Sequence, residues 1–88
     1  MRIFIDGDNC NTINKIVEQA KKQTVEVHIY CDTRHIINND YATIHVVEFG
    51  PNSVDMAIIK NMKSGDTVYT NDSGLAQRVK TMNGIPYK

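Results

Sequence analysis

Four aspartates stand in three short motifs that are far apart in the sequence, and together they could form a metal-dependent catalytic centre: Asp6-Gly7-Asp8, Asp55 and Asp72. Carboxylates held in contact repel, because two unit charges about 4 Å apart cost roughly 4 kcal/mol at an effective dielectric of 20. Protons could relieve this repulsion through raised pKa values, but oxygen-only ligands from aspartates are what octahedral Mg²⁺ or Mn²⁺ selects. The set therefore predicts a bound Mg²⁺ or Mn²⁺ that supports attack of water on a phosphodiester.

The hypothesis gives each carboxylate a role in a hydrolase. Asp6 and Asp72 anchor the first ion, and Asp55 ligates it or activates the attacking water. Asp8 supports a second ion or orients the other ligands. Three polar neighbours are weaker candidates for donating to phosphate or orienting the carboxylates: Asn9, Asn71 and Ser73. Turn residues of these types are also common for purely local reasons.

Each aspartate also has a local interpretation at the start of a helix. Asp8 or Asn11 could cap the first predicted helix. Asp72 or Ser73 could cap the last one, and Asp55 could lie favourably in a first turn. Taken singly, capping is the commoner role, but it explains less readily why three acidic helix starts converge on one sheet edge. The two roles are not exclusive, and we favour the metal site.

The carboxylates can meet only if strands and helices alternate, and the apolar periodicity predicts this arrangement. Short apolar runs predict strands at residues 2–6, 25–31, 43–49, 67–70 and 85–87. Helical spacing of apolar residues predicts helices at about 11–23, from 53 onwards and across 75–82. The polar stretch 32–41 is interpreted as a loop that could contain one helical turn.

Parallel strands with right-handed crossovers favour an α/β fold, a three-layer α/β/α sandwich with a mainly parallel sheet in the order 3-2-1-4-5. This order places strands one and four side by side, and ligands collect beyond the carboxyl ends of such strands. Asp6 and Asp72 follow those two ends. Asp55 reaches the same edge only if its helix begins there, as we predict.

Composition limits the classes of protein to consider. The chain has 88 residues, 41% of them apolar, which predicts one domain over residues 1–88. Its net charge is zero, so no overall field attracts nucleic acid or an anionic membrane. Apolar runs are too short to span a bilayer, and Cys10 and Cys31 form neither a metal-finger spacing nor a disulfide framework. We expect a cytoplasmic protein with no membrane role.

The histidines and the basic side chains give weaker signals. His28 and His45 lie in predicted strands, where a structural histidine is commoner than a ligand, and His35 lies in the unassigned loop. Arg34 and Lys60 could hold phosphate, although a solvated charge is the commoner role of such residues. None of the five is assigned to the site.

Three motifs resemble the PIN-like and NYN-like nuclease superfamily, and most closely its bacterial YaiI/YqxD family. The opening I-F-I-D-G-D-N-C resembles an apolar strand followed by D-x-D-A-C. G-P-N-S-V-D-M-A-I resembles G-x-D-A-A-D-x-x-I, and T-N-D-S-G-L-A resembles T-A-D-x-x-L-A. The resemblance spans nearly the whole chain and implies a PIN-like sandwich that hydrolyses single-stranded or structured RNA, with RNA favoured over DNA as the nucleic-acid partner. It implies acidic metal ligands at the following positions: Asp6, Asp8, Asp55 and Asp72.

The sequence departs from the family pattern at three points. Asn52 replaces an aspartate, Asn11 replaces a proline, and the chain stops at Lys88 where relatives continue past the fifth strand. We therefore expect a minimal or C-terminally truncated domain. Three alternatives stay open: a minimal enzyme, a truncated remnant, or a subunit whose nucleic-acid surface comes from a partner or a second copy. The rival function is a catalytically silent PIN-like binding or regulatory module.

Overall fold

Strands and helices alternate along the chain, and the computed structural model describes all residues from Met1 to Lys88. The elements are β1 (Ile3–Asp6), α1 (Ile13–Lys22), β2 (Val27–Asp32), β3 (Thr43–Val47), α2 (Ser53–Asn61), β4 (Thr67–Tyr69), α3 (Ser73–Thr81) and β5 (Ile85–Tyr87). All neighbouring strands pair in parallel, in the order β3-β2-β1-β4-β5. The α/β class and the predicted strand order are therefore confirmed.

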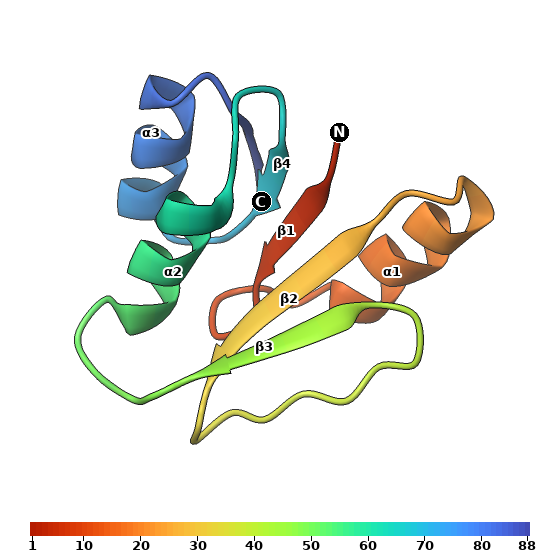
Figure 1. The fold of residues 1–88 in the computed structure, drawn as a ribbon, viewed down its shortest axis with the longest axis horizontal. Coiled ribbons are helices and arrows are strands. Elements are labelled where there is room, and N and C mark those ends of the chain that lie inside the picture. Colours follow the sequence, from red (N-terminus) through yellow and green to blue (C-terminus); the bar gives the residue numbers. More distant parts are fainter.

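The helices cover the two faces of the sheet and make it the middle of three layers, with α1 on one side and α2 and α3 on the other (Figure 1). Successive side chains of a strand point to opposite faces, and β1 follows this rule. Ile3 and Ile5 pack in the cluster that contains the buried residues of α1. Phe4 packs in the cluster that contains those of α2 and α3. Burial on both faces explains the continuous apolar run of β1.

The helix α1 shows how the periodicity fixes the packing. Ile16, Val17 and Ala20 recur on one face and are buried, whereas Lys21 and Lys22 occupy the last turn, where their charges favour the helix dipole. None of the helices is both long enough and apolar enough to cross a membrane.

The segment after β2 differs from its predicted form. Asp32 is the last residue of β2 and pairs with Val47 of β3, and no helical turn forms between the two strands. The Asp32 side chain instead accepts a hydrogen bond from the backbone N–H of Arg34, at 2.8 Å. Such aspartate turns compete with helix formation, which explains why the suggested helical turn is wrong.

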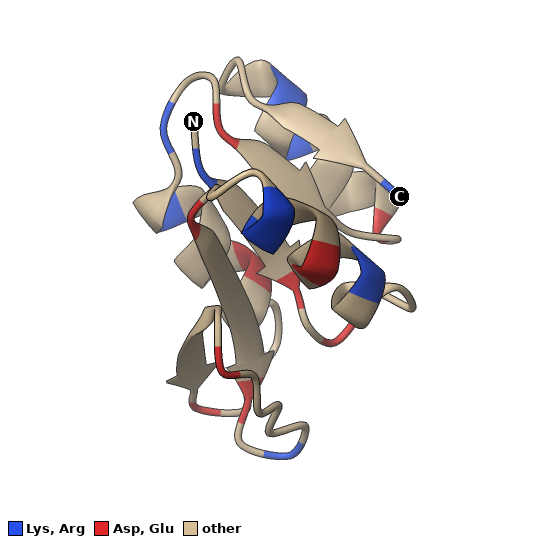
Figure 2. Cartoon of the chain, turned by 90° about the vertical axis from the view of Figure 1, so that its right-hand side faces the viewer, with Lys and Arg blue, Asp and Glu red and all other residues tan.

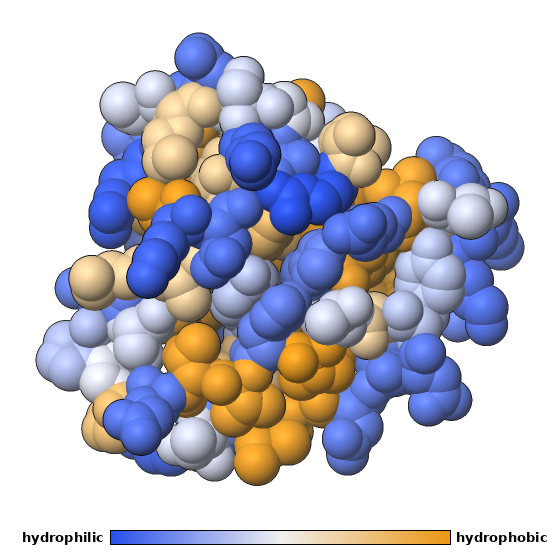
Figure 3. All heavy atoms as spheres, viewed as in Figure 1, coloured by the Kyte–Doolittle hydropathy of each residue, from blue (hydrophilic) through white to orange (hydrophobic).

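The edge strand β3 is less covered than the inner strands. Its residues are intermediate or exposed, and Val46 is 47% exposed. Apolar atoms are visible over this side of the molecule in the space-filling view (Figure 3). The buried core is therefore formed mainly around β1, β2 and β4. The polar residues described next lie at the carboxyl ends of strands in this part of the sheet.

Candidate metal centre

A small cavity of about 150 Å³ lies where the carboxyl ends of β1 and β2 meet the first turns of α2 and α3. It contains all four aspartates that the sequence singled out, together with one further aspartate. The lining residues are Asp6, Asp8, Asn9, Asp32, Gly50, Asn52, Ser53, Val54, Asp55 and Asp72. The fold therefore brings together acidic side chains that are as much as 66 positions apart in the sequence, from Asp6 to Asp72.

Asp6 is the most deeply buried of these carboxylates. Its side chain is fully buried, and its Oδ2 accepts a hydrogen bond from Thr70 Oγ1 at 2.8 Å. Its Oδ1 is buried without any hydrogen-bond partner. Burial raises the pKa of Asp6 and the charge of Asp72 adds to the rise, although the hydrogen bond from Thr70 and the nearby polar groups of Asn9 and Asp8 oppose it. One buried carboxylate oxygen of Asp6 therefore has no hydrogen-bond donor to compensate its negative charge.

Thr70 links Asp6 to Asp72, and sequence reasoning did not select it. The hydroxyl oxygen of this buried threonine accepts the N–H of Asp72 at 3.0 Å while it donates to Asp6. Asp72 then caps α3, because its Oδ1 accepts the N–H groups of Gly74 at 2.8 Å and Leu75 at 3.2 Å. The capping interpretation of Asp72 is confirmed, and its Oδ2 accepts none of these bonds.

Asp55 lies in the first turn of α2, which begins at Ser53 as predicted. The residue before this helix, Asn52, adopts a left-handed backbone conformation with φ 58°, and its side chain makes no capping bond. Burial raises the pKa of Asp55, and the charges of Asp6 and Asp72 raise it further. Since those charges act through space, Asp55 shares an electrostatic environment with the strand-end aspartates.

Asp8 is held by the tight turn after β1. The Gly7 N–H donates to the carbonyl of Tyr30 at 2.7 Å, and a Cβ at Gly7 would lie 2.7 Å from that oxygen. Only glycine allows this approach to β2. Asp8 does not cap α1, whose N-cap is Thr12. Its Oδ1 is buried without a hydrogen-bond partner, and burial, followed by the charge of Asp32, raises its pKa.

Asp32 also lines the cavity but was not among the predicted site residues, because residues 32–41 were interpreted as a loop. Burial raises its pKa, but the N–H of Arg34 and the side chain of His35 together hold the pKa below its usual value. A signal was available in the sequence. Asp32 follows the apolar run of β2 as Asp6 follows that of β1, and the predicted strand order already placed these two strands side by side.

Only one of the three weaker polar candidates lines the cavity. Asn9 lines the cavity, whereas Asn71 and Ser73 do not. Asn71 donates its N–H to the carbonyl of Asn9 at 2.8 Å, which joins the turns after β1 and β4. Ser73 is the first residue of α3. Neither residue is therefore part of the cavity lining, and Asn71 contributes by joining two of the loops around it.

The two strand histidines and Arg34 form structural contacts. His28 Nδ1 and His45 Nε2 form a hydrogen bond of 2.8 Å between β2 and β3. The guanidinium of Arg34 stacks 3.5 Å from the centroid of the Phe49 ring. Lys60 lies in the last turn of α2, away from the cavity lining. The structural interpretation of the two strand histidines is therefore confirmed.

The donor set fits a hard divalent cation. The cavity is lined by five aspartates and by no basic side chain. Lysines and arginines are spread over several elements of the chain rather than gathered on one face (Figure 2). Mg²⁺ and Mn²⁺ favour oxygen ligands and retain several waters, so a small polar cavity with an unpartnered buried oxygen at Asp6 suits them.

The comparisons with known proteins place this chain in one family. Residues 4–85 match the family model described as "Uncharacterized BCR, YaiI/YqxD family". A "UPF0178 protein" of Clostridium kluyveri is 46% identical over 79 residues, which cover 90% of this chain and 52% of that protein. A "UPF0178 protein" of Clostridium perfringens is 43% identical over 76 residues, covering 86% of this chain and 51% of that protein.

The chain spans about half the length of the curated relatives it matches. No solved structure matches it. The predicted resemblance to the YaiI/YqxD family is confirmed, because the matched residues 4–85 include β2, β3, β4, the three helices and all five cavity aspartates. This chain belongs to the YaiI/YqxD family.

Proposed function

We propose that this chain is a divalent-metal-dependent nuclease that hydrolyses phosphodiester bonds in single-stranded or structured RNA. The observation that carries the proposal is the buried Oδ1 of Asp6, which has no hydrogen-bond partner in a cavity lined by five carboxylates. Ionised carboxylates at this density repel an anionic phosphate, and a bound cation both removes that repulsion and attracts the phosphate. The choice of RNA rests on the resemblance of the motifs to PIN-like nucleases.

The side chains divide the work according to their contacts. Asp6 and Asp72 would hold Mg²⁺ or Mn²⁺, with the Oδ2 of Asp72 free of the cap bonds that occupy its Oδ1. When bound, the ion supplies Lewis-acid polarisation of a phosphodiester and of water. Asp55 is the group that we assign to accept the proton of the attacking water, because burial and its acidic neighbours make it more basic than an exposed aspartate.

Two structural features fix the positions of these side chains relative to one another. Thr70 holds Asp6 and the backbone of Asp72 through one hydroxyl group, so the two ligands move together. Asp8 is placed beside Asp32 by the glycine turn after β1, and we assign Asp8 to support a second ion. Both features come from parallel strand ends, where ligand sites of doubly wound sheets form.

The test is a cleavage assay on labelled single-stranded RNA and DNA with Mg²⁺ or Mn²⁺. Asp6→Asn and Asp72→Asn are the informative variants, because asparagine is nearly isosteric and caps a helix as well as aspartate does. Asp40→Asn removes an exposed carboxylate outside the cavity and is the matched control. Cleavage by the wild type and the control, but by neither cavity variant, is expected. Cleavage that survives both cavity substitutions refutes the assigned centre.

A second candidate function is a catalytically silent binding or regulatory module that keeps the metal site. The observation in its favour is the zero net charge of the chain, together with a cavity lining that contains no basic residue and lysines and arginines that lie on several elements (Figure 2). This alternative gains if metal binds, the cavity variants abolish binding, and no RNA or DNA is cut. A partner subunit or a second copy would then have to supply the nucleic-acid surface.

A further inference from the structure

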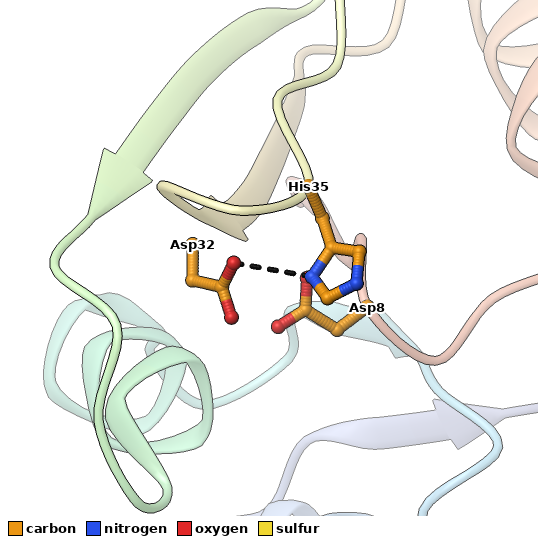
Figure 4. Close-up of side chains that lie close together, drawn as sticks. All are labelled: Asp8, Asp32 and His35. Carbon is orange, nitrogen blue, oxygen red and sulfur yellow. Dashed lines mark hydrogen bonds and ion pairs between the residues drawn. The ribbon is translucent and has the colours of Figure 1, made fainter.

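A second group of metal-binding side chains lies at the rim of the cavity, and it contains a nitrogen donor. Asp8, Asp32 and His35 each offer one ligand atom, and the three atoms lie within 4.8 Å of one another. Figure 4 shows the two carboxylates beside the imidazole ring, which comes from the loop after β2. We propose that these three side chains bind a transition-metal ion, with Zn²⁺ the closest match to their chemistry.

One ring proton cannot satisfy both carboxylates. His35 Nδ1 lies 3.1 Å from Asp32 Oδ1 and 3.5 Å from Asp8 Oδ1. A ring nitrogen carries at most one hydrogen, and the hydrogen bond is made with Asp32. Asp8 Oδ1 is left buried without a hydrogen-bond partner. A cation shared by the three atoms satisfies all of them at once.

The distances between the donor atoms suit a small ion. Two ligands placed about 2.1 Å from Zn²⁺ in tetrahedral geometry are about 3.4 Å apart. The two distances from His35 Nδ1, 3.1 Å and 3.5 Å, lie on either side of this value. The third distance, between the ligand oxygens of Asp8 and Asp32, is within 4.8 Å, so the two carboxylates can close around an ion held by His35. Three protein ligands leave a fourth position for water.

The imidazole makes this site different from the all-oxygen cavity beside it. Imidazole nitrogen favours Zn²⁺ and similar transition metals, whereas carboxylate oxygens alone favour Mg²⁺ or Mn²⁺. The loop is already ordered, since Asp32 accepts N–H groups from Arg34 through its side chain and from His35 through its carbonyl. The His35 side chain is 55% exposed, so an ion reaches it from solvent.

This site goes beyond the proposed nuclease centre, because it contains His35 and Asp32, to which that centre assigns no role. Asp8 and Asp32 line the cavity as well, but only Asp8 has a role in both proposals, and His35 lies outside the cavity lining. Binding of Zn²⁺ requires neither RNA nor catalysis. The inference can therefore stand or fall independently of the nuclease proposal.

The test is Zn²⁺ titration of the purified chain, followed by calorimetry and by nuclear magnetic resonance of the histidine ring nitrogens. We expect one equivalent of Zn²⁺ to shift the His35 signals and to leave those of His28 and His45 in place. His35→Gln should weaken Zn²⁺ binding by at least about tenfold, since even indirect support of a ligand is worth that much. Asp40→Asn, which removes an exposed carboxylate in the same loop, should bind as the wild type does.

Two results overturn the inference: Zn²⁺ binding without a shift at His35, or unchanged affinity in His35→Gln. Thermal melts in EDTA check that His35→Gln is folded. If this variant does not fold, the presence or absence of a Zn²⁺ shift at His35 in the wild-type spectra still tests the inference. Cleavage of RNA is scored separately. A Zn²⁺ shift at His35 without cleavage removes the nuclease proposal alone, and cleavage that depends on Asp6 without such a shift removes this inference alone.

Discussion

Divalent cations should stabilise the folded chain, and Asp6→Asn should remove most of this effect. The reason is local, because Asp6 is fully buried with one oxygen lacking any hydrogen-bond partner, among four other carboxylates. The unfolded chain cannot assemble residues from four separate segments, so only the folded state offers the complete ligand set. Binding to the folded state alone raises the free energy of unfolding by mass action.

The size of the effect follows from the ion concentration and the chain length. At an ion concentration 100 times the dissociation constant, the stabilisation is about 2.7 kcal/mol. For a domain of 60 to 100 residues, each kcal/mol shifts the melting temperature by roughly 4–8 °C. This chain has 88 residues, so saturating Mg²⁺ or Mn²⁺ should raise its melting temperature by about 10–20 °C.

Circular dichroism melts in EDTA and across a Mg²⁺ titration measure this shift. The quantity to compare is the ion-induced change within each variant, since Asp6→Asn also alters the stability of the metal-free protein. Asp40→Asn should keep the wild-type response, because its carboxylate is exposed and outside the cavity. A wild-type melting temperature that ignores both ions, or an equal shift in Asp6→Asn, would refute the reasoning.

Asp55→Asn tests the electrostatics without metal. Burial and the charges of Asp6 and Asp72 raise the folded pKa of Asp55 above its ordinary 3.8, so the contribution of Asp55 to stability falls as pH rises through that interval. In EDTA the variant should match the wild type below the interval and exceed its unfolding free energy above it, and a difference that stays constant with pH would contradict this. Leu75→Ala should cost about 2–5 kcal/mol in urea unfolding, because Leu75 is 1% exposed. The exposed Gln77→Ala in the same helix should cost under about 0.5 kcal/mol, and equal losses would contradict the packing of α3.

The fold could be predicted because its periodicity is unambiguous where burial is deepest. β1 is buried on both faces and carries an uninterrupted apolar run, and α1 buries its residues at helical spacing. Element ends were less predictable. Asp32 extends β2 because β3 pairs with it across the sheet, and such a tertiary contact leaves no periodic trace in the local sequence.

The site was predictable to the extent that it depends on strand order. Placing β1 beside β4 was enough to bring Asp6 near Asp72, and the start of α2 brought in Asp55. The roles of Thr70 and His35 could not be predicted, because they depend on individual hydrogen bonds and on the path of one loop. Side-chain geometry of this kind is set by packing after the topology is fixed.

The way in which the cavity is neutralised bears on both proposed functions. Protonation can remove the repulsion among the aspartates. Burial favours protonation, because it raises the pKa values of Asp6, Asp8 and Asp55. A protonated cavity still has no basic side chain in its lining, and the Arg34 guanidinium at its rim is already paired with Asp32 Oδ2 at 3.9 Å, so little positive charge is left for a phosphate. An ion removes the repulsion and also attracts the phosphate. RNA binding at the cavity should therefore require Mg²⁺ or Mn²⁺ even in a silent module, whereas binding that persists in EDTA would place the RNA on another surface.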